Sequence, residues 1–461
     1  MITERVPMME PAEQIVVAFS GEGAGVEELT WGQRAIWNAM TEQDTSLPIG
    51  RWLPLPEGTT VRHMANELRF HMTRHQSMRM RLVYGEDGRP RQSVAASGEI
   101  TLEVYDAGDG DPAAVAEKVS QRYMDAPFDY ANEWPIRMAV VRRGEVATHV
   151  VCVLCHLVTD AAGGLAMVAD LANMDPVTGE ATVPVTATQP LDLARWQQTP
   201  AGQRRHASSL RYWEEQLRGV PSYRFAKPAQ RHSPRHWEGQ LISPALLLAT
   251  EALAKRLGVS ASNLTLAAYA MMLVKLRGVD PIVIRPVVSN RFWPGLADIV
   301  SPINEAGLCV IPVEGAGFAE MAARASRIAM RAFKAAYYHP EPMDELFATV
   351  ARDRGEQLDI DCFMNDRRVA AIPDGPAPTA QELRLAPRGE FRWTAKQDKP
   401  FGRLFLHIDD APDAVSLTVR ADTDYVDPAI MRGIAEGIEE IFIEAAADLR
   451  ADDLPAVPAT V

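Results

Sequence analysis

The change of pattern between residues 149 and 164 constrains the fold more than any other feature of this chain. Residues 149–155 (HVVCVLC) form a short apolar run that is typical of a buried strand. His156 ends this run, and after Asp160 the small residues of 161–164 lead into a predicted helix that extends to residue 172. His156 is therefore expected at the end of a buried strand, where a substrate can reach it. Asp160 can turn inward to fix the loop or cap the helix.

Length and composition limit the classes of function. A chain of 461 residues is too long for one ordinary core, so two domains are expected. Its net charge of −14 argues against nucleic acid as the main partner, because phosphate binding needs a basic face. No stretch approaches the roughly eighteen consecutive apolar residues that span a membrane. Residues 1–14 show no secretory pattern, and four cysteines fit a reducing compartment, so a cytoplasmic protein is expected.

Helical and extended patterns alternate along the chain, which predicts an α/β fold of two lobes. The division is placed at residues 219–240, rich in Pro, Arg and His, giving an N-terminal lobe of 1–219 and a C-terminal lobe of 220–461. Helices are predicted over 29–40, 60–70, 113–124, 165–172, 200–217, 245–257, 262–276, 318–338 and 428–447. Strands are predicted over 14–19, 80–84, 138–141, 149–155, 281–288, 308–313, 404–408 and 415–420.

Several short motifs follow one another along the chain, at 29–37 (LTWGQRAIW), 74–81 (RHQSMRMR), 127–129 (PFD) with 135–137 (PIR), 155–161 (CHLVTDA), 287–291 (VVSNR) and 301–304 (SPIN). In type and order they resemble the motifs of the condensation domains of nonribosomal peptide synthetases, within the HxxxD acyltransferase superfamily. The resemblance extends from about residue 29 to residue 447. Several motifs in the right order are far more specific than any one of them.

The resemblance implies two chloramphenicol-acetyltransferase-like lobes in a V-shaped pseudo-dimer, with the HxxxD motif in the first. It implies a buried ion pair between Asp160 and Arg291, which makes Asp160 a shaping residue and not a proton carrier. The implied reaction transfers an acyl or aminoacyl group from a phosphopantetheine thioester to an amine. No carrier attachment sequence or adenylation signature is present. We therefore expect a free-standing enzyme that meets an acyl or peptidyl carrier protein in trans, with no permanently bound cofactor.

The residues themselves suit this chemistry. An imidazole that is neutral near pH 7 can accept a proton from an amine or position it, which makes His156 the predicted catalytic residue; a hydrogen-bonded core histidine is the alternative. The amides of Ala161 and Ala162, at the start of the helix, are predicted to stabilise an oxyanion. Gly164 and Asn304 are predicted to contact the substrate, although Asn304 can equally well satisfy the end of a strand.

Three other functions stay open. Cys155 replaces the first histidine of the family's HHxxxDG signature, and Ala161 replaces its glycine; these departures from the family pattern leave an inactive domain open. An alcohol acceptor would give an ester, and an acyl-coenzyme A donor would make the protein an acyltransferase independent of a carrier. A catalytically inactive recruitment module is the third alternative.

The segment 152–156 (CVLCH) also spells the pattern for covalent haem attachment. We reject this interpretation because the cysteines lie in a predicted strand, where positions 152 and 155 face opposite sides. They cannot share a metal ion or a disulfide, and no metal site is predicted.

Overall fold

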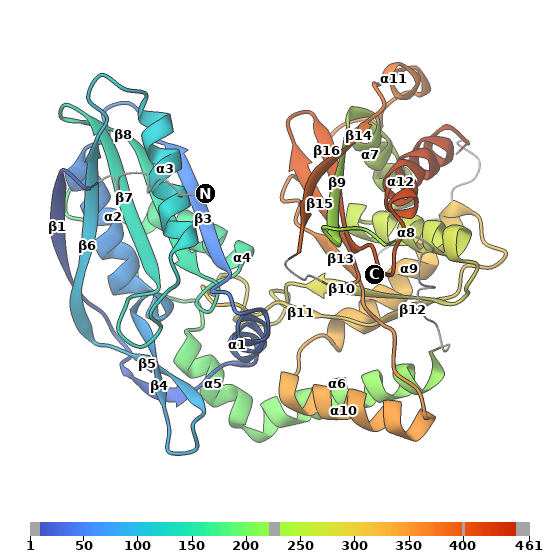
Figure 1. Cartoon of the computed structure of the whole chain (residues 1–461), viewed down its shortest axis with the longest axis horizontal. Coiled ribbons are helices and arrows are strands. Elements are labelled where there is room, and N and C mark those ends of the chain that lie inside the picture. The colour runs from blue at the N-terminus through green and yellow to red at the C-terminus, as the bar shows by residue number, and fades with distance from the viewer. Residues whose placement is uncertain (1–9, 221–230, 399–401, 449–461) are drawn as a thin grey trace. The chain divides into compact units, whose positions relative to one another are not determined.

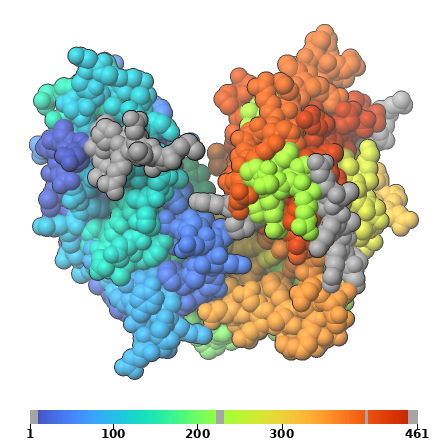
Figure 2. Space-filling model, viewed as in Figure 1, coloured from blue at the N-terminus to red at the C-terminus, as the bar shows by residue number. Residues whose placement is uncertain are grey.

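The computed structural model describes residues 10–220, 231–398 and 402–448. By internal packing the chain forms two compact units. Unit 1 comprises residues 1–206 and 289–304, and unit 2 comprises residues 207–288 and 305–461. Figures 1 and 2 colour most of unit 1 from blue to green and most of unit 2 from yellow-green to red. The division at residue 219 stays a prediction, and the packing adds that residues 289–304 belong with the first unit.

Unit 1 is built on a five-stranded sheet of order β1-β6-β7-β8-β3, in which only β6 and β7 are parallel neighbours. These strands are β1 (Glu13–Ser20), β3 (Pro48–Pro54), β6 (Ser97–Asp106), β7 (Ile136–Arg143) and β8 (Val146–Cys155). A smaller sheet contains β2 (Gly25–Glu28), β5 (Pro90–Val94) and β4 (Met80–Tyr84). The helices are α1 (Trp31–Gln43), α2 (Val61–Arg74), α3 (Pro112–Asp125), α4 (Ala161–Ala169) and α5 (Pro190–Gln198), with short 3₁₀ turns η1 (Gln76–Arg79) and η2 (Asp170–Asn173).

Unit 2 contains an eight-stranded sheet with β11-β10-β13-β15-β16-β9-β14 along its path and β12 paired to β10. The strands are β9 (His236–Ser243), β10 (Ile282–Val288), β11 (Glu305–Ala306), β12 (Cys309–Ile311), β13 (Cys362–Asp366), β14 (Glu390–Gln397), β15 (Leu404–Ala411) and β16 (Ala414–Asp422). Its helices are α7 (Pro244–Leu257), α8 (Ala261–Arg277), α9 (Phe318–Lys334), α10 (Pro340–Arg354), α11 (Ala380–Leu385) and α12 (Pro428–Asp448). Helix α6 (Pro200–Gly219) carries the chain from unit 1 into unit 2.

Each unit buries its own apolar core between sheet and helices. In unit 1 the core includes Leu102, Val140 and Val151, on three neighbouring strands. In unit 2 it includes Leu406 and Leu417 of β15 and β16, together with buried side chains of α7, α8, α9 and α12. Two sheets covered by helices are the mixed α/β architecture that the sequence predicts, and the fold class is confirmed.

No single helix in the described ranges has the length and apolar character needed to cross a membrane. Helices α7 and α8 pass such a test only as a pair, bent by 107°. Many of their side chains lie in the buried core of unit 2.

Candidate active site

Strand β8 delivers His156 to the end of the sheet of unit 1. The strand lies between β7 and β3, and its last residue, Cys155, is fully buried. The backbone then turns sharply, because the Val158 amide donates to the Cys155 carbonyl at 3.1 Å. Helix α4 begins five residues after His156. The predicted strand, turn and helix are all present in this order.

A main-chain carbonyl fixes the orientation of the His156 ring. Nδ1 of His156 lies 2.8 Å from the carbonyl oxygen of Thr159. A carbonyl oxygen only accepts hydrogen bonds, so Nδ1 must carry the proton and Nε2 of the neutral ring keeps its lone pair. The ring is half-buried, whereas Thr159 is fully buried. This arrangement gives one fixed nitrogen base, which is what proton transfer from an attacking amine requires.

The carboxylate of Asp160 is buried and fully occupied by hydrogen bonds. Its Oδ1 accepts from the Gly163 amide at 2.8 Å and from Nη2 of Arg291 at 2.7 Å. Its Oδ2 accepts from Nη1 of Arg291 at 3.0 Å and from the Ile303 amide at 3.1 Å. The bond to Gly163 caps α4, so Asp160 is both the helix cap and the ion-pair partner considered from the sequence. It holds the loop and has no contact with the His156 ring among these bonds.

Arg291 joins the loop after β8 to a distant segment of the same unit. Besides Asp160, its guanidinium donates to the carbonyls of Ile299 and Ser301, both at 3.2 Å. It also donates to Oδ1 of Asn304 at 3.3 Å. A side chain at position 163 would meet the Arg291 guanidinium at 3.1 Å and the Thr159 hydroxyl at 2.5 Å. Glycine at this position therefore allows the close approach of Arg291.

The other candidate residues surround this ion pair. Oδ1 of Asn304 accepts a hydrogen bond from the Arg291 guanidinium, a role that neither interpretation of the sequence named. Contact of Asn304 with a substrate and its role at a strand end both stay predictions. Ala161 and Ala162 form the first turn of α4, where amides have no acceptor within the helix. Gly164 has nothing within 4 Å of the point where a Cβ would lie, so its face borders open space. The oxyanion and substrate-binding roles of these residues stay predictions.

The two cysteines on β8 are free thiols with raised pKa values. Burial raises the pKa of both the Cys152 and Cys155 thiols to about 12. Both are free, and Cys155 lies beside Phe128 and Tyr130 in the interior. Within the described ranges, no group of three or more His, Cys, Asp or Glu side chains could hold a metal ion.

Other motif residues form the framework around the site. Arg137 donates to the carbonyls of Tyr123, Ala126 and Pro127, which fixes the chain before β7. Gly32 of α1 packs so tightly that a Cβ there would lie 2.1 Å from the Pro302 carbonyl oxygen. The motif at residues 29–37 thus contacts the motif at residues 301–304.

Comparison with known proteins decides the family. The family model described as the condensation domain matches residues 33–365, which include His156, Asp160 and Arg291. The chain belongs to the condensation-domain family. The phosphinothricin tripeptide synthetase PhsB of Streptomyces viridochromogenes is 26% identical over 219 residues, which are 44% of this chain and 18% of PhsB. The probable non-canonical nonribosomal peptide synthetase CymA of Salinispora arenicola is 24% identical over 397 residues, 81% of this chain and 5% of CymA. The chain thus spans less than a fifth of the length of each of these two relatives.

Solved condensation-domain structures share the fold. The structure described as the molecular basis for condensation domain-mediated chain release from the enacyloxin polyketide synthase has a TM-score of 0.70 at 19% identity, covering 96% of this chain and 86% of that one. The X-domain in complex with OxyB from teicoplanin biosynthesis has a TM-score of 0.66 at 18% identity, covering 97% and 98%. At these identities the likeness shows the fold alone.

Proposed function

We propose that this condensation domain transfers an acyl or aminoacyl group from a carrier-protein phosphopantetheine thioester to an amine, with His156 as the base. The observation that carries the proposal is the bond from Nδ1 of His156 to the Thr159 carbonyl, which leaves Nε2 as a fixed acceptor. Membership of the condensation-domain family supports the reaction class.

In this reaction the amine nitrogen attacks the thioester carbonyl carbon, and a C–N bond forms as the carbonyl oxygen becomes an oxyanion. Nε2 of His156 takes the proton that the nitrogen sheds. Amides of the first turn of α4 stabilise the oxyanion, since they carry the positive end of the helix dipole. The C–S bond then breaks, and the thiolate receives the proton from the imidazolium. The amide product and a free phosphopantetheine thiol leave.

Loaded carrier proteins, offered with panels of amines and alcohols, test this proposal by mass spectrometry of the products. We expect amide formation by the unaltered protein and a loss of about 10²–10⁴-fold in kcat for His156→Ala. His149→Ala is the matched control, because His149 is a half-buried histidine like His156 but lies within β8, and its loss should leave turnover unchanged. Full activity in the His156 variant would refute the mechanism.

The same assay separates the alternatives. Ester products would show that the acceptor is an alcohol. Turnover with free acyl-coenzyme A in the absence of a carrier would show that the reaction needs no carrier protein. A recruitment function has one specific observation in its favour, the X-domain of the same fold in complex with OxyB. Under that alternative no donor is turned over, and the His156 variant binds the partner protein as the unaltered protein does.

A further inference from the structure

A second aspartate–arginine pair holds the far end of the helix that follows the HxxxD motif. Arg74, the last residue of α2, places Nε and Nη2 against the two carboxylate oxygens of Asp170, with Nη2 and Oδ1 3.0 Å apart. Asp170 is the C-cap of α4. The two side chains are 5% and 18% exposed, so the pair is largely shielded from water. We propose that Arg74 and Asp170 are positioning residues that set the placement of α4 and hence of the catalytic loop.

Helix α4 has little to hold it in place except its ends. It is only nine residues long, and a helix of that length is marginal alone. Gly163 and Gly164 weaken it further. Among its residues only Gly163 and Met167 are buried, whereas Leu165 and Val168 are 52% and 57% exposed. Because α4 buries so little surface, its position depends on the ion pairs at its two ends. These are Asp160–Arg291 at its start and Asp170–Arg74 at its end.

Asp170 lies where α4 ends and the 3₁₀ turn η2 begins. Its carboxylate is bound by Arg74 of α2 and by the side-chain amide of Asn173, which donates to Oδ1 at 2.8 Å. Nε2 of His75 also lies 3.4 Å from Asp170. Burial lowers the pKa of His75 to about 4, so Arg74 supplies the positive charge of this cluster at neutral pH.

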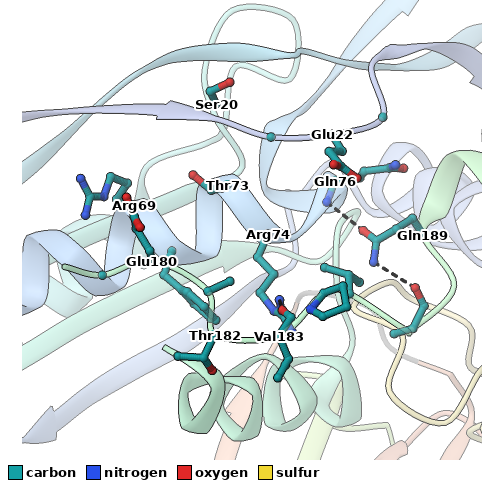
Figure 3. A pocket seen from close by; sticks show the side chains of 18 of the residues that line it. Ser20, Glu22, Arg69, Thr73, Arg74, Gln76, Glu180, Thr182, Val183 and Gln189 are labelled. Carbon is teal, nitrogen blue, oxygen red and sulfur yellow. Dashed lines mark hydrogen bonds between the residues drawn. The ribbon is translucent and has the colours of Figure 1, made fainter. Parts of the chain in front are cut away.

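Arg74 also reaches a segment outside the helices. Its Nη1 donates to the Val183 carbonyl at 2.7 Å, and its side chain lines a cavity of about 1090 Å³ between α2 and residues 179–189. Figure 3 shows Arg74 extending from α2 towards Val183, with Arg69 and Thr73 on the same helix. Because this cavity opens beside Arg74, a small cation can enter the space that a truncated side chain would leave. That allows a chemical test of the role of the guanidinium.

The first experiment measures kcat and KM separately for Arg74→Ala, Arg74→Lys and Asp170→Asn in the acyl-transfer assay, and so rests on the proposed function. We expect kcat to fall by about 10–100-fold, as for a catalytic group displaced by about 1 Å, with KM for the donor little changed. Guanidinium chloride at low, non-denaturing concentration should restore part of the kcat of Arg74→Ala and none of that of Asp170→Asn. Arg122→Ala is the control, because Arg122 pairs with Glu103 on elements that do not include α4.

Hydrogen exchange gives a second measurement that does not need turnover. We expect faster exchange confined to the peptides that cover residues 156–170 in Arg74→Ala, and the same for the milder Arg74→Lys if the alanine variant does not fold. Unchanged exchange there, or a kcat loss that guanidinium does not relieve, would overturn the positioning role. Absence of turnover in the unaltered protein would instead count against the proposed function, and the exchange measurement would still decide the role of the pair.

Discussion

Removing the charge of Asp160 is the perturbation whose effect follows most directly from the structure. The side chain is 1% exposed and its carboxylate accepts four hydrogen bonds, two from Arg291 and two from main-chain amides. Asp160→Asn keeps the shape of the side chain but leaves the Arg291 guanidinium, 11% exposed, without its counter-ion. The cost is therefore that of a buried, uncompensated charge and not that of one hydrogen bond.

The expected loss is about 3–5 kcal/mol, the usual result of removing one partner of a buried pair. Arg291→Met should cost less, because the remaining carboxylate keeps the amides of Gly163 and Ile303. The double variant should lose less free energy than the sum of the two single losses, since no unpaired charge remains.

Thermal and urea unfolding of the four proteins measure these values. A loss of 3–5 kcal/mol in a unit of roughly 220 residues corresponds to a fall of roughly 6–20 °C in the melting temperature of unit 1. Hydrogen exchange assigns the transition to unit 1, because a chain of two units need not unfold in one step. Glu390→Ala is the control, since its pair with Arg392 is three-quarters exposed and should leave stability unchanged. Strictly additive losses in the double variant would refute the reasoning.

Three further predictions use other features of unit 1. Gly164→Val should fold normally, because a Cβ at position 164 meets open space, and should lower turnover, because Gly164 is a predicted substrate contact. Gly163→Val should destabilise the fold, because a Cβ at position 163 would lie 2.5 Å from the Thr159 hydroxyl. Circular dichroism and turnover measurements together check both variants. Burial lowers the pKa of His71 to about 3 from about 6.5 in the unfolded chain, so its contribution to stability is complete above pH 6.5 and declines by up to about 1.4 kcal/mol per pH unit towards pH 3. His71→Leu should flatten that dependence in unfolding measurements, and parallel curves would contradict it. The Cys155 thiol, with its pKa raised to about 12, should react with iodoacetamide only after unfolding, and rapid labelling of the native protein would show the burial to be wrong.

The elements next to His156 were predictable because their signals are local. Strands β7 and β8 are adjacent in the chain and form the predicted antiparallel pair. The predicted helix after the motif is α4, although it begins at Ala161, earlier than its apolar pattern suggested. The capping role of Asp160 follows from its place before that helix and is present as the bond to Gly163.

Strands that pair over long distances were missed. Strand β9 begins in the stretch that the composition marks as a boundary, yet it pairs with β16 and β14, more than 140 residues later. Strand β13 is five residues long and ends in Asn365 and Asp366, so its pattern is too short to detect. Helix α10 was missed although Pro340 occupies its first turn, which is a helix-start signal that the sequence offered.

Contacts between site residues that are far apart in the chain were likewise not predictable from local sequence patterns. Asp160 and Arg291 are 131 residues apart, and only the resemblance to the family linked them. Neither the Thr159 carbonyl that orients His156 nor the Arg74–Asp170 pair has a periodic or compositional signal. Main-chain acceptors and ion pairs between elements depend on the turn geometry and on tertiary packing, which no local pattern encodes.

The departures from the family pattern at Cys155 and Ala161 spare His156 and Asp160. Cys155 packs in the interior of unit 1, while the ring of His156 is oriented by the Thr159 carbonyl one turn later. Replacing a histidine by cysteine at position 155 therefore changes core packing and leaves the His156 ring and its orientation intact. Ala161 has a helical backbone at the start of α4, where φ is negative and any residue is allowed. Alanine in place of the family's glycine therefore keeps the main-chain amide and loses only conformational freedom that this position does not use. Both substitutions are compatible with an active domain.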